Sequence, residues 1–451
     1  MLATAALLIH LPPIQNYLSN KLTSYLTEGT GYKTEIDYIN IKWFNAVSID
    51  GTQIYDLKDV KMIGIEELVL TFKLADIIGK SNIETKEAWV KGADVNLRDQ
   101  TTRRLNIDDW VIKLSELLAG EATTTGAAAG SFSIDQITLL DSRFSISDSS
   151  LDSVKTGFDY NHFQLVDLNA DLLNLKAVAD TFQLDVKRLS TRDSISGFKI
   201  DQLSTFFRNS WKGMAFYELD LKMGKSRITN EVVFNHDRPG LMGYFVDSVY
   251  IEANFDGTVL HTDELSYFAP ELKEYSESVE IDGFFEGEVR DFFSDDFKIQ
   301  FGNFTKLAGE MQVEGLPDIN VSIFDISLDK STLSAKDLEE YIGKRAFDIS
   351  DKLGGINLDG SFTGFLNNFV AQGRFDTEIG SFISNTQIKI EEGRLPTYSG
   401  ALKTDDFDLG IFTGDPVFQK IDMNGDINGA GFTIEDANFT LGADIPKIGI
   451  N

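Results

Sequence analysis

Residues 421–429, Ile-Asp-Met-Asn-Gly-Asp-Ile-Asn-Gly, offer a side-chain oxygen at every second position, from Asp422, Asn424, Asp426 and Asn428. Alternating oxygen ligands of this kind begin the calcium loop of helix-loop-helix proteins. That loop also requires Gly at its sixth position and Glu at its twelfth, where this chain has Ile427 and Thr433. An extended strand would spread the four oxygens over ~20 Å, too far apart to surround one ion. The alternation is therefore better interpreted as the polar face of a β-strand.

Other motifs that carry chemistry are incomplete in this chain. The histidines are isolated and lack the spacing of a helical zinc site: His10, His162, His236 and His261. Two Gly-Lys-Ser tripeptides, 79–81 and 224–226, lack the glycine that a phosphate-binding loop needs five residues earlier, so we interpret both as polar turns. The chain has no Gly-x-Ser-x-Gly nucleophile elbow. Nothing in the sequence predicts an enzyme, a metal site or a cofactor.

Composition narrows the function classes further. The chain has 451 residues, of which 42% are hydrophobic, so it can bury a substantial surface. Phe is abundant (34 residues) and Pro is scarce (8), which favours long Phe-lined strands. Cysteine is absent, which excludes disulfides and thiolate sites. A formal net charge of -30 argues against nucleic acid as a partner, because phosphate binding needs basic surface.

The N-terminal residues 1–29 are predicted to form a membrane-proximal helical anchor. The apolar run MLATAALLIHL is too short for a ~30 Å hydrocarbon core, which takes ~20 helical residues, so we expect it to be the distal half of a membrane helix. A short buried N-terminal helix is the alternative. From Ile14 to Leu26, apolar residues recur every three or four positions, which predicts an amphipathic helix that Gly29 and Gly31 close.

From residue 30 onward the pattern changes to alternation of apolar and polar residues, which predicts strands. We expect an N-terminal β segment over 30–119, a flexible linker over 120–131 around GEATTTGAAAG, and a repeated β segment over 132–451. Only two later segments are predicted to be short helices, one capped by Thr262 and one by Ser334.

An internal repeat marks the last third of the chain. Apolar residues and glycines alternate in three sets that begin at Val279, Ile356 and Ile421. A Leu-Pro pair follows each of the first two sets at a similar distance, at 316–317 and 395–396. The repeat unit is therefore several strands long, as in arrays whose units bury their apolar faces against one another.

Alternation gives each repeated strand one apolar and one polar face. A β-sandwich core would explain the apolar face, but the long uninterrupted strand pattern and the sparse helices favour a different fold: an elongated, curled antiparallel β-sheet that forms a taco-like groove. Such a groove needs an apolar occupant. The residues predicted to line it are Val279, Ile281, Phe285, Ile356, Leu358, Phe362, Ile421, Met423 and Ile427.

The N-terminal course, LPPIQNYLSNKLTSYLTEGTGY followed by VSIDGTQIYD, resembles the TamB-like members of the AsmA superfamily, particularly the divergent forms of the Bacteroidetes. The family's v.i.G..i.D step is matched by Val47, Ile49, Gly51, Ile54 and Asp56. Further along, ELSYFAPELKEYSESVEIDGFFEGEV and GGINLDGSFTGFLNNFVAQGRFDTEIGSF look like successive copies of the family's repeated segment. The resemblance covers most of the chain in order, through motifs that are largely hydrophobic.

The resemblance implies a translocation and assembly module protein that is anchored in the inner membrane and crosses the periplasm of a Gram-negative envelope. Such proteins are thought to pass phospholipids along a hydrophobic β-groove in support of outer-membrane biogenesis, and to partner an Omp85-class outer-membrane barrel. Because the pattern stops at IPKIGIN without the family's barrel-docking domain, we expect this chain to be an N-terminal segment of a longer protein. The expected partners are phospholipid acyl chains and the inner membrane, with the barrel contacted through a region outside this sequence.

Two other functions fit the same pattern. The groove or its sheet edges would act as a chaperone or assembly factor for outer-membrane β-barrels by strand addition. Alternatively, the chain is a surface adhesin or closed β-solenoid with a dry interior and no inner-membrane anchor.

Overall fold

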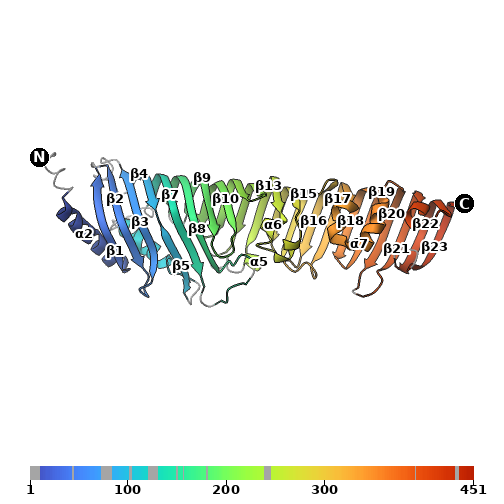
Figure 1. Cartoon of the computed structure of the whole chain (residues 1–451), viewed down its shortest axis with the longest axis horizontal. Helices are drawn as coiled ribbons and strands as arrows, with labels where there is room; N and C mark the ends of the chain where they lie inside the picture. Colours follow the sequence, from blue (N-terminus) through green and yellow to red (C-terminus); the bar gives the residue numbers. More distant parts are fainter. Residues whose placement is uncertain are drawn as a thin grey trace, which may run out of the picture. The chain divides into compact units, whose positions relative to one another are not determined.

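The computed structural model describes residues 11–42, 45–72, 84–100, 104–119, 131–148, 151–155, 157–178, 181–237, 245–391, 393–431 and 436–450 (Figure 1). The chain divides into two compact units. The N-terminal unit comprises Met1–Gly243 with Asp263–Lys273, and the C-terminal unit comprises Tyr244–Thr262 with Glu274–Asn451. The predicted mostly β fold, with an antiparallel sheet and an N-terminal helix, is confirmed. The expected linker over 120–131 lies almost wholly outside the described residues.

The N-terminal unit begins with the predicted amphipathic helix. Pro at the first helical positions presets its backbone dihedral, and Gly31 ends it in the left-handed conformation (φ 74°), with its N–H donated to Thr27 O. A small core forms where Trp110 and Ile107 pack against Tyr32 and Met62. The elements of this first part are α2 (Pro12–Thr30), β1 (Thr34–Lys42), β2 (Ala46–Tyr55), β3 (Lys61–Phe72), β4 (Glu84–Lys91), β5 (Asp94–Gln100), β6 (Arg104–Leu105) and α4 (Asp108–Ala119).

The rest of this unit is a succession of long strands. β7 pairs in parallel with β4 and then with β5, whereas the pairings described from β7 to β12 are all antiparallel between neighbours in the chain. The strands are β7 (Ser131–Ser147), β8 (His162–Val178), β9 (Thr181–Asp193), β10 (Lys199–Ser210), β11 (Gly213–Met223) and β12 (Ser226–Asn235).

In the C-terminal unit each strand from β13 to β23 pairs antiparallel with the next one along the chain (Figure 1). The strands are β13 (Tyr250–His261), β14 (Ser278–Glu288), β15 (Asp291–Phe301), β16 (Thr305–Glu314), β17 (Ile323–Ser334), β18 (Gly355–Phe365), β19 (Asn368–Thr377), β20 (Gly380–Lys389), β21 (Thr397–Asp408), β22 (Phe418–Ala430) and β23 (Asn438–Ile450). Because consecutive strands pair, every strand between β13 and β23 has both of its edges hydrogen-bonded.

Short helices interrupt the strands of the repeat at regular intervals. They begin at almost equal spacing along the chain, at Thr262, Ala335 and Leu409, directly after β13, β17 and β21. The helices are α6 (Thr262–Leu265) with η2 (Pro270–Glu274); η3 (Ala335–Leu338) with α7 (Glu339–Ser350) and η4 (Asp351–Leu353); and α8 (Leu409–Thr413). The repeat unit is therefore four strands plus one helical segment.

Helix prediction from the sequence was incomplete. The two predicted short helices exist, and Ser334 Oγ accepts the N–H of Lys336 as the expected cap, at 3.3 Å. The prediction that no other short helices follow is wrong, because α4, α5 (Phe245–Ser248) and α8 also form. α4 was missed although Trp110, Leu114 and Leu117 recur at four- and three-residue spacing, so the signal for this helix was present in the sequence. α5 and α8 are each little more than one turn long, too short to show any period.

Candidate functional site

One face of the β13–β23 sheet is uncharged at every paired position from β14 to β22. Residues directly opposite one another in neighbouring strands share a face, so the register traces this surface across the sheet. We call it the apolar face. One row across it is Leu358, Phe375, Phe382, Thr404 and Met423. A parallel row on the other side of Gly360 is Phe362, Ala371, Thr386, Gly400 and Ile427.

All nine residues predicted to line a groove lie on the apolar face, but they differ in burial. Four of them are only 6–8% exposed: Ile356, Leu358, Ile421 and Met423. The other five are partly exposed: Val279, Ile281, Phe285, Phe362 and Ile427. The apolar face therefore has a covered part and a more open part.

One section of the covered part, at Ile421 and Met423, lies under α8. Ile421 and Met423 form a core cluster with Ile379 and Phe407, against which Leu409 and Phe412 of α8 pack. The rings of Phe407 and Phe412 are 5.5 Å apart. Asp408 Oδ1 caps the helix by accepting the N–H of Ile411 at 2.9 Å. Ile421 and Met423 thus serve the core, and their side chains do not face an open surface.

The more open part carries two pairs of stacked phenylalanines. Phe362 stacks on Phe369 with ring centroids 4.5 Å apart, and Phe375 stacks on Phe382 at 4.8 Å. These four rings are partly exposed. The sequence prediction missed Phe369, Phe375 and Phe382 because it followed only one strand of each repeat. The alternation of Phe369 and Phe375 with Ala371 and Gly373 was the signal that would have found those two residues.

Glycines lie between the two pairs of phenylalanines. Gly360 pairs with Gly373, and a Cβ on either would meet a backbone oxygen of the other's strand at 2.3–2.4 Å. Gly373 also has φ 152°, a conformation that L side chains rarely adopt. Gly425 is equally tight, with Gly442 O at 2.4 Å from its Cβ position. Close strand approach explains why these positions hold glycine.

The polar face of the same strands anchors bulges in their neighbours. Lys330 lies at a register shift in β17 with φ 48°, and its N–H donates to Asp359 Oδ1 of β18 at 2.6 Å. Asp406 occupies the same kind of position in β21 (φ 51°), and its N–H donates to Asp422 Oδ1 of β22 at 2.7 Å. Such bulges bend and twist a strand. Asp422, first in the apparent calcium loop, is therefore a bulge acceptor within a strand.

Asp337 ties the helical segment η3 to the turn between β15 and β16. Its carboxylate accepts the N–H groups of Asn303, Phe304 and Thr305 at 2.8–2.9 Å and the Thr305 hydroxyl at 2.9 Å. Burial alone would raise the pKa of Asp337, but these hydrogen bonds outweigh it and hold the pKa below its ordinary value of 3.8.

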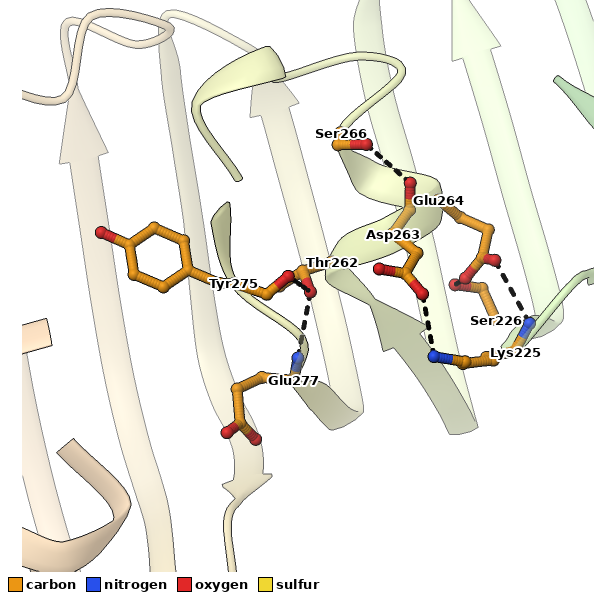
Figure 2. A network of polar contacts seen from close by, with 8 residues as sticks. All are labelled: Lys225, Ser226, Thr262, Asp263, Glu264, Ser266, Tyr275 and Glu277. Carbon is orange, nitrogen blue, oxygen red and sulfur yellow. Dashed lines mark hydrogen bonds and ion pairs between the residues drawn. The ribbon is translucent and has the colours of Figure 1, made fainter. Parts of the chain in front are cut away.

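The second Gly-Lys-Ser tripeptide, Gly224–Ser226, forms a turn that binds the helix after β13 rather than a phosphate site (Figure 2). Lys225 Nζ donates to Asp263 Oδ2 at 2.8 Å, and Ser226 Oγ donates to Glu264 Oε2 at 2.9 Å. This agrees with its interpretation as a polar turn. The first tripeptide, 79–81, lies outside the described residues.

Three histidines fall within the described residues, and they lie apart from one another in the chain. His162 contacts Asp159 Oδ2 through Nδ1 at 3.1 Å and Asp148 O through Nε2 at 2.6 Å, while His236 and His261 are buried. Within the described residues no group of three or more His, Asp or Glu side chains could hold a metal ion. His10, like most of the apolar N-terminal run, is outside them. Among the described helices, none combines the length and the apolar character needed to cross a membrane.

No family model, curated protein or solved structure matches this chain. The apolar face, with its charge-free rows and partly exposed phenylalanines, is the candidate functional site.

Proposed function

We propose that this chain is part of an inner-membrane-anchored, periplasmic scaffold that carries phospholipids between the inner and outer membranes by holding their acyl chains on the apolar face. The observation that carries this proposal is the absence of charge at every paired position of that face from β14 to β22, where large side chains such as Phe362 and Phe375 remain partly exposed. Exposed apolar surface of this extent usually marks a binding site.

The mechanism is passive. Each methylene group of the lipid that is buried from water stabilises the bound state by about 0.8 kcal/mol. An acyl chain that moves from one strand to the next exchanges similar apolar contacts, so its energy changes little along the sheet. Headgroups remain in water at the sheet margin. The resemblance to TamB-like proteins supports the same function and adds two proposed partners, the inner membrane through the N-terminal helix and an Omp85-class barrel.

Photocrosslinking from position 362 tests the proposal. A photoreactive residue replaces Phe362 in cells, and adducts are identified by mass spectrometry. We expect phospholipid adducts from 362 and few from Thr363, the next residue on the opposite, exposed face. Recovery of protein adducts alone from 362 would overturn the proposal.

A charged side chain at the same position should interrupt the path. Because a carboxylate resists burial against hydrocarbon, Phe362→Glu should lower the phospholipid that copurifies with the protein by about tenfold. Thr363→Glu is the matched control and should leave the lipid content unchanged. Equal lipid content in the two variants would contradict the assignment of Phe362 to the lipid-bearing surface.

Strand addition to a nascent outer-membrane protein is a second candidate. β23 carries exposed apolar side chains, including Phe439 and Ile448. Strand addition needs an unpaired strand edge, which can template another strand. Photocrosslinks from Phe439 to nascent barrel strands, with no lipid adducts from 362, would favour this function over lipid transport.

A further inference from the structure

We infer that a single acyl chain lies across strands β18 to β22 along one row of the apolar face, an inference that rests on the proposed function. The row runs through Gly360, Gly373, Ser384, Leu402 and Gly425, which are successive cross-strand partners. We call it the central row. It lies between the row of Phe362 and the row of Phe375 and Phe382.

Side-chain size sets the central row apart from the rows beside it. Three of its five members are glycines, and the fourth is Ser384, whose hydroxyl bonds the Thr386 hydroxyl at 2.9 Å. Leu402, the one large member, packs against the core cluster under α8. The flanking rows lie about 13 Å apart along each strand. A hydrocarbon chain that lies over these small residues would contact the phenylalanine rings of the flanking rows, since carbon atoms make contact at ~3.5–4.0 Å.

The length of the central row also suits an acyl chain. Five strands at ~4.8 Å spacing span roughly 19 Å. Each acyl chain of a bilayer fills half of a ~30 Å hydrocarbon core, about 15 Å. One chain therefore fits along the row without reaching beyond β18 and β22.

Backbone hydrogen bonding favours hydrocarbon over a peptide as the occupant. Each of β18 to β22 is hydrogen-bonded to a neighbouring strand on both edges. These strands therefore have no row of free backbone N–H and C=O groups to which a peptide on the apolar face could bond. An extended peptide there would bury its own N–H and C=O groups without partners, which carries a large desolvation cost. An acyl chain has no polar groups to satisfy.

Filling the row at Ser384 tests the inference. We expect Ser384→Phe to lower phospholipid photocrosslinking from position 362 by about tenfold, the equivalent of losing roughly two buried methylenes. Ser384→Ala, which keeps the row open, and Asn385→Phe, which adds the same ring on the opposite face, should both crosslink as the unmodified chain does. Circular dichroism and thermal unfolding check that each variant is folded.

A direct probe keeps the inference testable if Ser384→Phe does not fold. A photoreactive residue at Leu402, in the central row, should label the acyl part of phospholipids, and one at Lys403, its exposed neighbour on the other face, should not. Lipid adducts from 362 but none from 402 would overturn the central row while leaving the proposed function intact. Absence of lipid adducts from both positions would contradict the proposed function. Peptide adducts at 402 would show that a protein, and not an acyl chain, occupies the central row.

Discussion

At the scale of single residues, the polar face of the sheet stabilises bulges in neighbouring strands, as Asp359 does for Lys330. Alternation places Asp359, next to the predicted lining residue Leu358, on the polar face of β18. Its hydrogen bond to the N–H of Lys330 depends on a bulge in another strand, well before it in the chain. No periodicity within one strand reveals a register shift in its neighbour, so the role of Asp359 was beyond the reach of the sequence.

Asp359→Ala should destabilise the C-terminal unit by about 0.5–1.5 kcal/mol, because the bulge N–H loses its acceptor at a partly solvated site. Asp359→Asn retains the accepting oxygen and should cost less. Urea unfolding followed by circular dichroism measures both changes. Asn357→Ala, at an exposed position on the same face of the same strand, is the control. If Asp359→Ala and Asn357→Ala have equal effects, the bulge contact does not stabilise the sheet.

At the scale of elements, the sequence predicted the N-terminal helix and the strands but not the role of the helical segments after β13, β17 and β21. Ser334 carried a local capping signal, which the structure bears out. Asp337 carried no such local signal, because the N–H groups that donate to it belong to the turn after β15, two strands earlier in the chain. Capping is local in sequence, whereas attachment of a helix to a distant turn is not.

The Asp337 attachment predicts a pH-dependent contribution to stability. The pKa of Asp337 is lower in the folded chain than its ordinary value of 3.8. The carboxylate therefore stabilises the fold fully above about pH 4, and this contribution is lost as the pH falls through the folded pKa. Asp337→Asn should lower the free energy of unfolding by about 1–3 kcal/mol at pH 7 and by progressively less below pH 4. Urea unfolding at several pH values, with Asp351→Asn as an exposed control, measures the difference. A deficit that stays constant down to pH 3 would contradict the role of the charge.

At the scale of the whole molecule, the sequence predicted a repeat several strands long but not its true period. The apolar sets at Val279, Ile356 and Ile421 are unevenly spaced because the helical segments before the second and third sets differ in length. One extends from Ala335 to Leu353, whereas the other, α8, is a single short helix. The evenly spaced starts of the helical segments give the period directly. Register confirms it, since Leu333 faces Ile356 just as Phe407 faces Ile421.

This equivalence predicts that one whole repeat can be removed. Deletion of Ala335–Asp408 joins Ser334 to Leu409, so β17 should pair with β22 in the register that β21 has now, with Leu333 opposite Ile421.

Opposed residues in antiparallel strands have Cα atoms about 4.5–5.5 Å apart, within the range that a disulfide bridges. The chain has no cysteine, so a Leu333→Cys and Ile421→Cys pair gives a signal without background. The shortened chain should form this disulfide under mild oxidation, whereas in the full chain the two strands lie five apart, roughly 24 Å, and should not. An unfolded or uncrosslinked deletion variant would mean that the repeats are not interchangeable and that each boundary has its own packing. A crosslinked one would mean that register and face parity suffice to specify how the repeats join.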